Sequence, residues 1–219
     1  MGLDGLEDRV FDAVLFDMDG TLVDSTAAVY RAWARWAVEH GLTEDQMRGH
    51  DGIPAASIVA KFLPEDQREA GVLRINELEL NDTDGLLVLP GAVEALAAVA
   101  GAPNAIATSC TMPLAQARIA SSGLVAPSVL VTADQVEHGK PAPDPYLLAA
   151  ERLGVDPARC LVVEDAPLGL QAARAAGCAT LAVVTTTARE KLQADAVVGD
   201  LSEVRFEADA DGIRVRPAA

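Results

Sequence analysis

The chain reads Ala13-Val14-Leu15-Phe16-Asp17-Met18-Asp19-Gly20-Thr21-Leu22-Val23 at residues 13–23. The four apolar residues predict a buried β-strand, and the glycine after the second aspartate lets the backbone turn away sharply. Two carboxylates one residue apart at a strand end repel each other unless a cation lies between them. We therefore expect a metal-assisted carboxylate site at Asp17 and Asp19. A surface turn with two solvated aspartates is the alternative, because Asp and Gly are ordinary turn residues.

The composition is that of a globular protein with an aliphatic core. The 219 residues suffice for one large domain, or for one core domain with an insertion, and 50% of them are hydrophobic but only 4% aromatic. No apolar run approaches the roughly 18 residues that a membrane-spanning helix needs. The first nine residues are acidic and unlike a secretory signal. The cysteines Cys110, Cys160 and Cys178 lie in or beside apolar segments, which indicates free thiols of a reducing compartment. We expect a cytoplasmic protein.

The charge balance limits the partners of the chain. A formal net charge of −16 argues against nucleic acid or an anionic membrane, because both require a basic face. An anionic substrate would need concentrated positive charge from a metal, a helix N-terminus or a particular lysine. Lysine is rare, with only Lys61, Lys140 and Lys191, while arginine supplies the other 14 positive charges.

A helical segment interrupts the fold soon after the first strand. Helical spacing and capping residues predict helices over 26–40, 55–63 and 64–80, with no strand between 43 and 82. We expect a helical subdomain at residues 24–87, inserted between the two parts of a core that comprises residues 1–23 and 88–219.

Strands and helices alternate after this insertion. Apolar runs predict strands at 105–107, 128–131, 160–163 and 180–184, and the segments between them predict helices at 91–100, 111–122, 144–153 and 168–176. This order is typical of an α/β protein with a Rossmann-like parallel sheet that is covered on both faces. Residues 204–215 alternate around the Asp211-Gly212 turn, which predicts a C-terminal hairpin at the edge of the sheet.

Polar residues follow each predicted strand, where open parallel sheets bind their ligands. Four carboxylates, two hydroxyls and one ammonium should meet at this rim: Asp17, Asp19, Glu164, Asp165, Thr108, Ser109 and Lys140. The carboxylates call for a hard divalent cation, for which Mg²⁺ is the default. The hydroxyl and backbone N–H groups where Thr108 leads into a helix suit a phosphate. Lys140 can neutralise both a nucleophilic carboxylate and a phosphoryl group.

These motifs resemble those of the haloacid dehalogenase superfamily of phosphohydrolases, in the subfamily with a helical cap inserted after the first strand. The resemblance rests on Asp17-Met18-Asp19-Gly20-Thr21, Thr108, Lys140 in Gly-Lys-Pro, and Glu164-Asp165. It extends from Ala13 to about Val198. The segment 164–178, with 107–109 and 185–187, is similar to the glycerol-phosphate and 2-deoxyglucose-6-phosphate phosphatase branch, which implies a sugar or polyol phosphate as substrate.

The resemblance also implies roles for single residues. Asp17 would attack phosphorus to form an aspartyl-phosphate, and Asp19 would protonate the leaving oxygen and later deprotonate the attacking water. Mg²⁺ would bind Asp17, the Asp19 backbone carbonyl, Asp165 and, directly or through water, Glu164. Phosphoryl oxygens would bind Thr108, the Ser109 N–H and Lys140.

A closing cap implies a small phosphorylated metabolite as substrate, and a monomer or weak dimer is expected. The loop 48–54 is the segment of the cap most suited to face the substrate, with Arg48 and His50 as candidates to bind sugar hydroxyls. Polar residues of a loop are, however, more often merely solvated.

Two alternatives remain. A phosphomutase of the β-phosphoglucomutase type would share this core and cap, but it needs a second cationic phosphate site, and residues 26–29 supply no Lys or His. A non-catalytic regulator that binds phosphosugars is the alternative from another class; the intact catalytic positions speak against it. A dehalogenase would need no metal and would not require Asp19 with Glu164-Asp165.

Overall fold

A six-stranded parallel sheet forms the centre of the protein, in the order β5-β4-β1-β6-β7-β8. The computed structural model describes residues 3, 5–47, 49 and 53–218. The strands are β1 (Ala13–Phe16), β4 (Asn104–Ala107), β5 (Val129–Val131), β6 (Cys160–Glu164), β7 (Ala179–Val183) and β8 (Ala196–Val198). The expected α/β class and parallel sheet are confirmed. β8 was not among the strands expected from the sequence.

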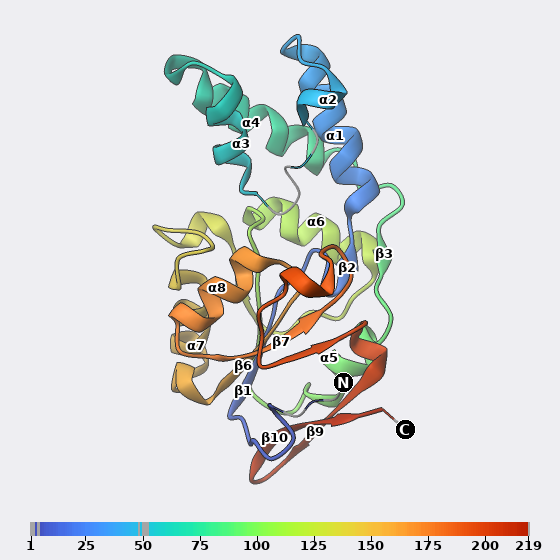
Figure 1. Cartoon of the computed structure of the whole chain (residues 1–219), viewed down its shortest axis with the longest axis vertical. Coiled ribbons are helices and arrows are strands. Elements are labelled where there is room, and N and C mark those ends of the chain that lie inside the picture. Colours follow the sequence, from blue (N-terminus) through green and yellow to red (C-terminus); the bar gives the residue numbers. More distant parts are fainter. Residues whose placement is uncertain (1–2, 4, 48, 50–52, 219) are drawn as a thin grey trace.

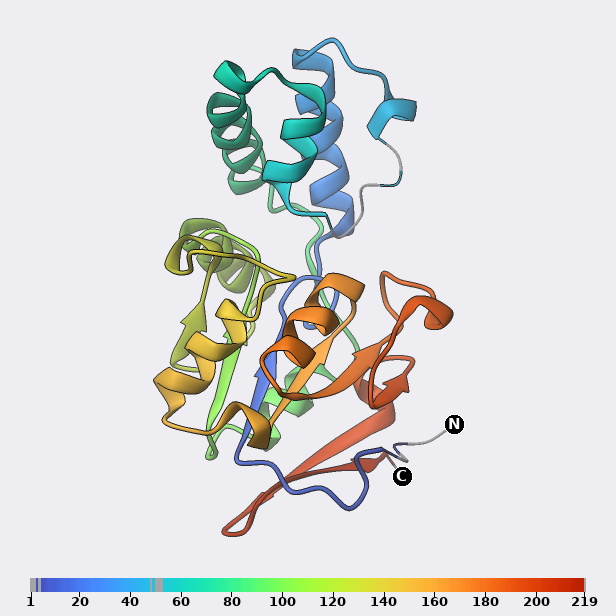
Figure 2. The same cartoon turned by 60° about the vertical axis from the view of Figure 1, so that its left-hand side comes forward.

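Helices cover both faces of this sheet (Figure 2). Val14 and Phe16 of β1 pack with α5 (Ala92–Ala98) and α6 (Met112–Ser122), whereas Ala13 and Leu15 pack with α7 (Asp144–Leu153) and α8 (Pro167–Ala175). Alternate side chains of a strand point to opposite faces, so the continuous apolar run of β1 fills both halves of the core. Short 3-10 helices lie at Ala133–Gln135, Pro157–Arg159, Arg189–Lys191 and Leu201–Glu203.

The C-terminal hairpin is present, but its expected position at the sheet edge is wrong. The strands β9 (Val204–Asp209) and β10 (Gly212–Pro217) form a separate antiparallel sheet, and β8 is the edge strand on that side. Phe206 of β9 packs edge-to-face on Phe16, with ring centroids 5.8 Å apart. The alternating apolar residues of the hairpin therefore cover a face of the central sheet instead of extending it.

Four helices stand above the carboxyl ends of the strands (Figure 1). These cap helices are α1 (Thr26–Glu39), α2 (Glu44–Met47), α3 (Ala55–Phe62) and α4 (Glu65–Leu80). They have a small apolar core of their own around Trp36, whose indole N–H donates to the Gly71 carbonyl at 2.9 Å. A side chain at Gly71 would collide with Leu63 and Val59, so the glycine allows α4 to lie close to its neighbours.

Two short strands connect the cap helices to the core. β2 (Val23–Asp24) and β3 (Leu87–Val88) pair antiparallel, so the chain enters and leaves the cap side by side. The Arg31 guanidinium of α1 binds both carboxylate oxygens of Asp82, at 2.7 and 2.8 Å, and thereby fixes the return segment against α1.

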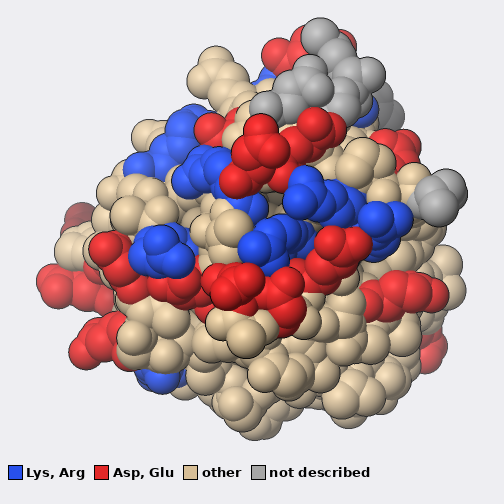
Figure 3. Space-filling view, turned by 90° about the horizontal axis from the view of Figure 1, so that it is seen from below, with Lys and Arg blue, Asp and Glu red and all other residues tan. Residues whose placement is uncertain are grey.

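The surface far from the cap carries no field of one sign. Basic and acidic side chains lie interspersed over the upper and middle part of this surface, and its lower part is largely uncharged, as Figure 3 shows. Several of the charged side chains are ion-paired, including Arg205 with Glu207 and Arg214 with Asp209. None of the helices in the described part of the chain is long and apolar enough to cross a membrane. The three cysteines are free and buried, as expected.

Candidate active site

The strand order brings the predicted site residues to one rim. β1 lies between β4 and β6, so Asp17, Thr108 and Glu164 end three adjacent strands. The backbone N–H of Asp17 donates to the Val163 carbonyl at 2.9 Å, and that of Thr108 donates to the Val131 carbonyl at 2.9 Å. Sheet hydrogen bonds therefore extend to the rim itself and hold these residues in register.

Lys140 lies at the centre of the cluster. It comes from the loop before α7, and its Nζ atom donates to Asp17 Oδ1 at 2.5 Å and to Glu164 Oε1 at 2.7 Å. The side chains of all three residues are almost completely buried. A buried ammonium is stable only when it is paired, and here two carboxylates pair with it.

Glu164 has its hydrogen-bonding capacity filled by protein groups. Its Oε1 also accepts from the Tyr146 hydroxyl at 2.9 Å, and its Oε2 accepts from the backbone N–H groups of Asp165 and Ala166 at 3.0 Å each. A carboxylate offers about four lone-pair sites, and four donors occupy those of Glu164. This arrangement fixes Lys140 beside Asp17.

Asp165 lies against the turn that follows β1. Its Oδ1 accepts from the Thr21 hydroxyl at 3.3 Å, and its Oδ2 accepts from the Thr186 hydroxyl. Gly20 has a φ of +86°, and a Cβ there would lie 2.3 Å from Asp165 Oδ2. The glycine predicted as a turn residue is thus also needed for the close approach of Asp165.

Burial and crowding disfavour the charged forms of Asp17 and Asp165. Burial, followed by the charge of Glu164, raises the pKa of Asp165 to about 7. Burial also raises the pKa of Asp17 well above its usual value, although Lys140 opposes the shift. Burial alone would lower the pKa of Lys140, but Asp17 and Glu164 together raise it. One ammonium does not balance three buried carboxylates, so the site favours an additional cation.

The donor set fits a hard metal ion. Carboxylate oxygens of Asp17, Glu164 and Asp165 lie within 4.8 Å of one another, and all three residues are buried. Three anionic oxygen donors around one point match the preference of Mg²⁺. Of these, Asp17 and Asp165 retain more capacity for a metal than Glu164 does.

Asp19 has a different environment from Asp17. Its Oδ2 binds Arg118 Nη1 at 2.8 Å and accepts from the Cys110 thiol at 3.1 Å. Its Oδ1 is buried and has no hydrogen-bond partner among the described residues. One oxygen of Asp19 is therefore held, and the other is left for a ligand or a proton.

A small cavity of about 70 Å³ adjoins Lys140, between the core and the cap. Thr108, Ser109 and Lys140 line it from the core, and Pro54 lines it from the start of α3. Pro54 therefore brings the start of α3 close to the rim. Arg48 and His50 of the loop before α3 lie outside the described residues, and their expected role stays a prediction.

A larger cavity, of about 320 Å³, lies within the cap between α1 and α4. Its arginines Arg31, Arg35 and Arg74 are each paired with Glu39, Glu77 or Asp82. It contains none of the rim residues, so we place the site at the smaller cavity, where the carboxylates and Lys140 meet.

The contributors to the site that were not predicted from the sequence include Glu79, Cys110, Arg118, Tyr146, Gly169 and Thr186. Arg118 follows Leu114 and Ala115 on the buried face of α6, so a charge on an apolar helix face was the available signal. Tyr146 occupies a comparable position on α7. For Glu79 and Gly169 the sequence offers no comparable signal.

Gly169 of α8 is required for the position of Glu164. A Cβ on residue 169 would lie 1.6 Å from Glu164 Oε1, so Gly169→Ala must displace the carboxylate that holds Lys140. We expect a loss of about 2 kcal/mol of unfolding free energy, because several charged hydrogen bonds are broken. We also expect at least a tenfold fall in kcat. Gly101→Ala is the matched control, because nothing lies within 4 Å of a Cβ there. Equal behaviour of the two variants in thermal unfolding and turnover would contradict this role.

Comparisons with known proteins agree with this geometry. The haloacid dehalogenase-like hydrolase family matches residues 11–177. Hexitol phosphatase A of Escherichia coli (strain K12) is 42% identical over 205 residues, which cover 90% of this chain and 95% of that protein. Glycerol-1-phosphate phosphohydrolase 2 of Saccharomyces cerevisiae is 33% identical, over 80% of this chain and 75% of its own. A solved structure of a putative beta-phosphoglucomutase from Thermotoga maritima is 33% identical, with a TM-score of 0.65, and the match covers 85% of this chain and 94% of that one.

Proposed function

Because the chain belongs to the haloacid dehalogenase-like hydrolase family and is a phosphoric monoester hydrolase, we propose that it hydrolyses a small sugar or polyol phosphate through an aspartyl-phosphate on Asp17. The observation that carries this proposal is the pairing of Lys140 with Asp17 at the end of β1, beside Asp19. The similarity to hexitol phosphatase A over nearly the whole chain supports the substrate class.

We infer that the site binds Mg²⁺. Asp17, Asp165 and the backbone carbonyl of Asp19 would hold the ion, and it would supply charge neutralisation and orientation of the phosphoryl group. The filled hydrogen-bonding capacity of Glu164 favours an indirect role, in which it orients Lys140 or reaches the ion through water.

The residues of the chain divide the remaining work. Asp17 attacks phosphorus as the bond to the leaving oxygen breaks, and Asp19 gives that oxygen a proton. Asp19 then takes a proton from the water that attacks the aspartyl-phosphate, which releases inorganic phosphate and regenerates the Asp17 carboxylate and the protonated acid form of Asp19. Lys140, Thr108 and the Ser109 N–H bind the phosphoryl oxygens and stabilise the charge of the transition state.

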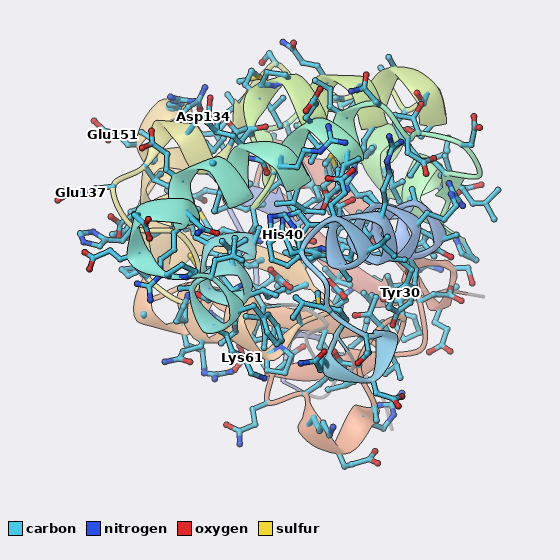
Figure 4. All side chains as sticks on the ribbon, turned by 90° about the horizontal axis from the view of Figure 1, so that it is seen from above. Tyr30, His40, Lys61, Asp134, Glu137 and Glu151 are labelled. Carbon is cyan, nitrogen blue, oxygen red and sulfur yellow. The ribbon has the colours of Figure 1, made fainter. Side chains whose placement is uncertain are left out.

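A phosphomutase is the second candidate, because a putative beta-phosphoglucomutase is among the similar structures. It would need a cationic group in the cap to hold a second phosphate. Within the described part of the cap, His40 stacks on Trp36 and binds its carbonyl, while Lys61 lies over the Phe62 ring. Both side chains come from the cap helices (Figure 4) and have partners there. This arrangement favours the phosphatase.

A substrate panel tests the proposal. The protein with Mg²⁺ is expected to release inorganic phosphate from hexitol, hexose or glycerol phosphates at least about tenfold more efficiently, in kcat/KM, than from nucleotides, because a cap leaves little room for a bulky leaving group. Glucose 1-phosphate with a catalytic amount of the bisphosphate is the control. Isomerisation without phosphate release would identify a mutase, and release from nucleotides alone would contradict the proposed substrate class.

A further inference from the structure

Arg118 of α6 connects the rim of the core to the cap. It is only 4% exposed, and its guanidinium contacts three groups from three different segments. Nη1 lies 2.8 Å from Asp19 Oδ2 and 2.9 Å from the Cys110 sulfur, while Nη2 donates to Glu79 Oε2 at 2.8 Å. Glu79 belongs to α4, the last of the cap helices, and its side chain is 13% exposed.

The position of Arg118 is unfavourable for a residue that only packs. Burial of a guanidinium costs several kcal/mol unless good partners compensate it, and an aliphatic residue beside Leu114 and Ala115 would avoid this cost. Two carboxylates compensate this cost, Asp19 of the rim and Glu79 of the cap. Neither belongs to the set of residues that holds Lys140.

We propose that Arg118 is a positioning residue that orients Asp19 and makes this orientation depend on the position of the cap. The inference rests on the proposed function, in which Asp19 transfers protons. Arg118 and the Cys110 thiol fix Oδ2, so Oδ1, which has no partner among the described residues, is the oxygen presented for proton transfer. A carboxylate that is held through one oxygen can rotate only a little. A freely rotating acid would have to lose this rotational entropy in each turnover, whereas Asp19 has lost it before the substrate binds.

The shared guanidinium supplies the link to the cap. Two carboxylates on separate parts of the fold bind one planar group in fixed directions. A shift of α4 relative to α6 must therefore lengthen one of the two ion pairs or rotate Arg118 with it. Asp19 is therefore held most firmly in its present direction when Glu79 also binds Arg118.

The dependence of turnover on the leaving group distinguishes positioning from a merely structural role. An alcohol leaving from a hexitol phosphate needs a proton, whereas 4-nitrophenolate leaves readily without one. For Arg118→Lys, which cannot reach both carboxylates, we expect the rate of aspartyl-phosphate formation, measured in a single turnover, to fall about 100-fold for the hexitol phosphate but less than about threefold for 4-nitrophenyl phosphate. The second step, hydrolysis of the aspartyl-phosphate, is common to both esters and does not enter this comparison. Glu79→Gln should show the same selective loss, about tenfold, because it weakens only the cap end. The KM values should change less than about threefold in both variants.

Arg74→Lys and Glu77→Gln are the matched controls. They belong to a second ion-paired cluster, in which Arg74 binds Glu39 and Glu77 within the cap, and they should leave the ratio of the two rates of aspartyl-phosphate formation unchanged. If Arg118→Lys does not fold, the result for Glu79→Gln alone tests the proposal, because that variant keeps the buried guanidinium of Arg118.

Equal losses on both esters, or no loss on either, would overturn the positioning role while leaving the proposed function intact. A wild-type protein that hydrolyses neither ester would instead overturn both.

Discussion

Asp17→Asn is expected to lower kcat by at least about 10⁴-fold for every phosphate ester, because it removes the nucleophile and not merely a contact to the substrate. An amide is a poor nucleophile and cannot form the aspartyl-phosphate. The loss should be as large for 4-nitrophenyl phosphate as for a hexitol phosphate, because a better leaving group does not replace the attacking carboxylate.

The fold of this variant should survive. Lys140 keeps Glu164 as a partner. The mutation also removes a buried carboxylate whose pKa is raised by burial and, to a smaller extent, by repulsion from Glu164 and Asp165. Thermal unfolding by circular dichroism checks this point. Asp12→Asn is the matched control, because Asp12 lies just before the N-terminal end of β1, at the other end of the strand from Asp17, and pairs with Arg159. Turnover by Asp17→Asn within tenfold of wild type would exclude the assignment of the nucleophile.

Removal of divalent metal should reduce kcat to below about 1% of its initial value, and Mg²⁺ should restore it, because an anionic nucleophile and an anionic phosphate otherwise repel each other. A second measurement does not depend on turnover. Mg²⁺ binds only the folded site, so at about 100 times its dissociation constant it should stabilise the protein by about 2.7 kcal/mol.

The variant Asp165→Asn should lose most of this stabilisation, since it removes one of the three clustered carboxylates. Glu203→Gln is a suitable control, because Glu203 accepts the Gly199 N–H and is not one of the three clustered carboxylates. Full activity in excess chelator, together with an unfolding temperature that does not change when Mg²⁺ is added, would rule out the metal site.

Much of the rim was predictable because its residues adjoin the strands that position them. The run Ala13–Phe16 is buried on both faces, and Asp17 follows it directly, so the strand and the carboxylate were recognised together. The helix Asp144–Leu153 was predicted with the bounds that the structure has, because Pro143 and Gly154 border it. The residues that follow several parallel strands must meet at one edge, whatever the details of packing.

The contacts that were missed come from residues far apart in the chain. Nothing local to Glu79 indicates that it meets Arg118, which lies 39 positions later on another helix. The gap that Gly169 leaves for Glu164 likewise depends on how α8 lies against β6. The hairpin was placed at the edge because its alternation shows which side of each strand is apolar, not which surface that side will cover.

The attack of Asp17 on phosphorus is tested most directly by a crystal structure obtained with Mg²⁺ and trifluoroberyllate, a mimic of a phosphoryl group. We expect the beryllium to be bonded to a carboxylate oxygen of Asp17, with its fluorines near Lys140 and Thr108. Trifluoroberyllate bound to another side chain, or an Asp17 carboxylate that remains free beside it at saturating concentration, would contradict the aspartyl-phosphate mechanism.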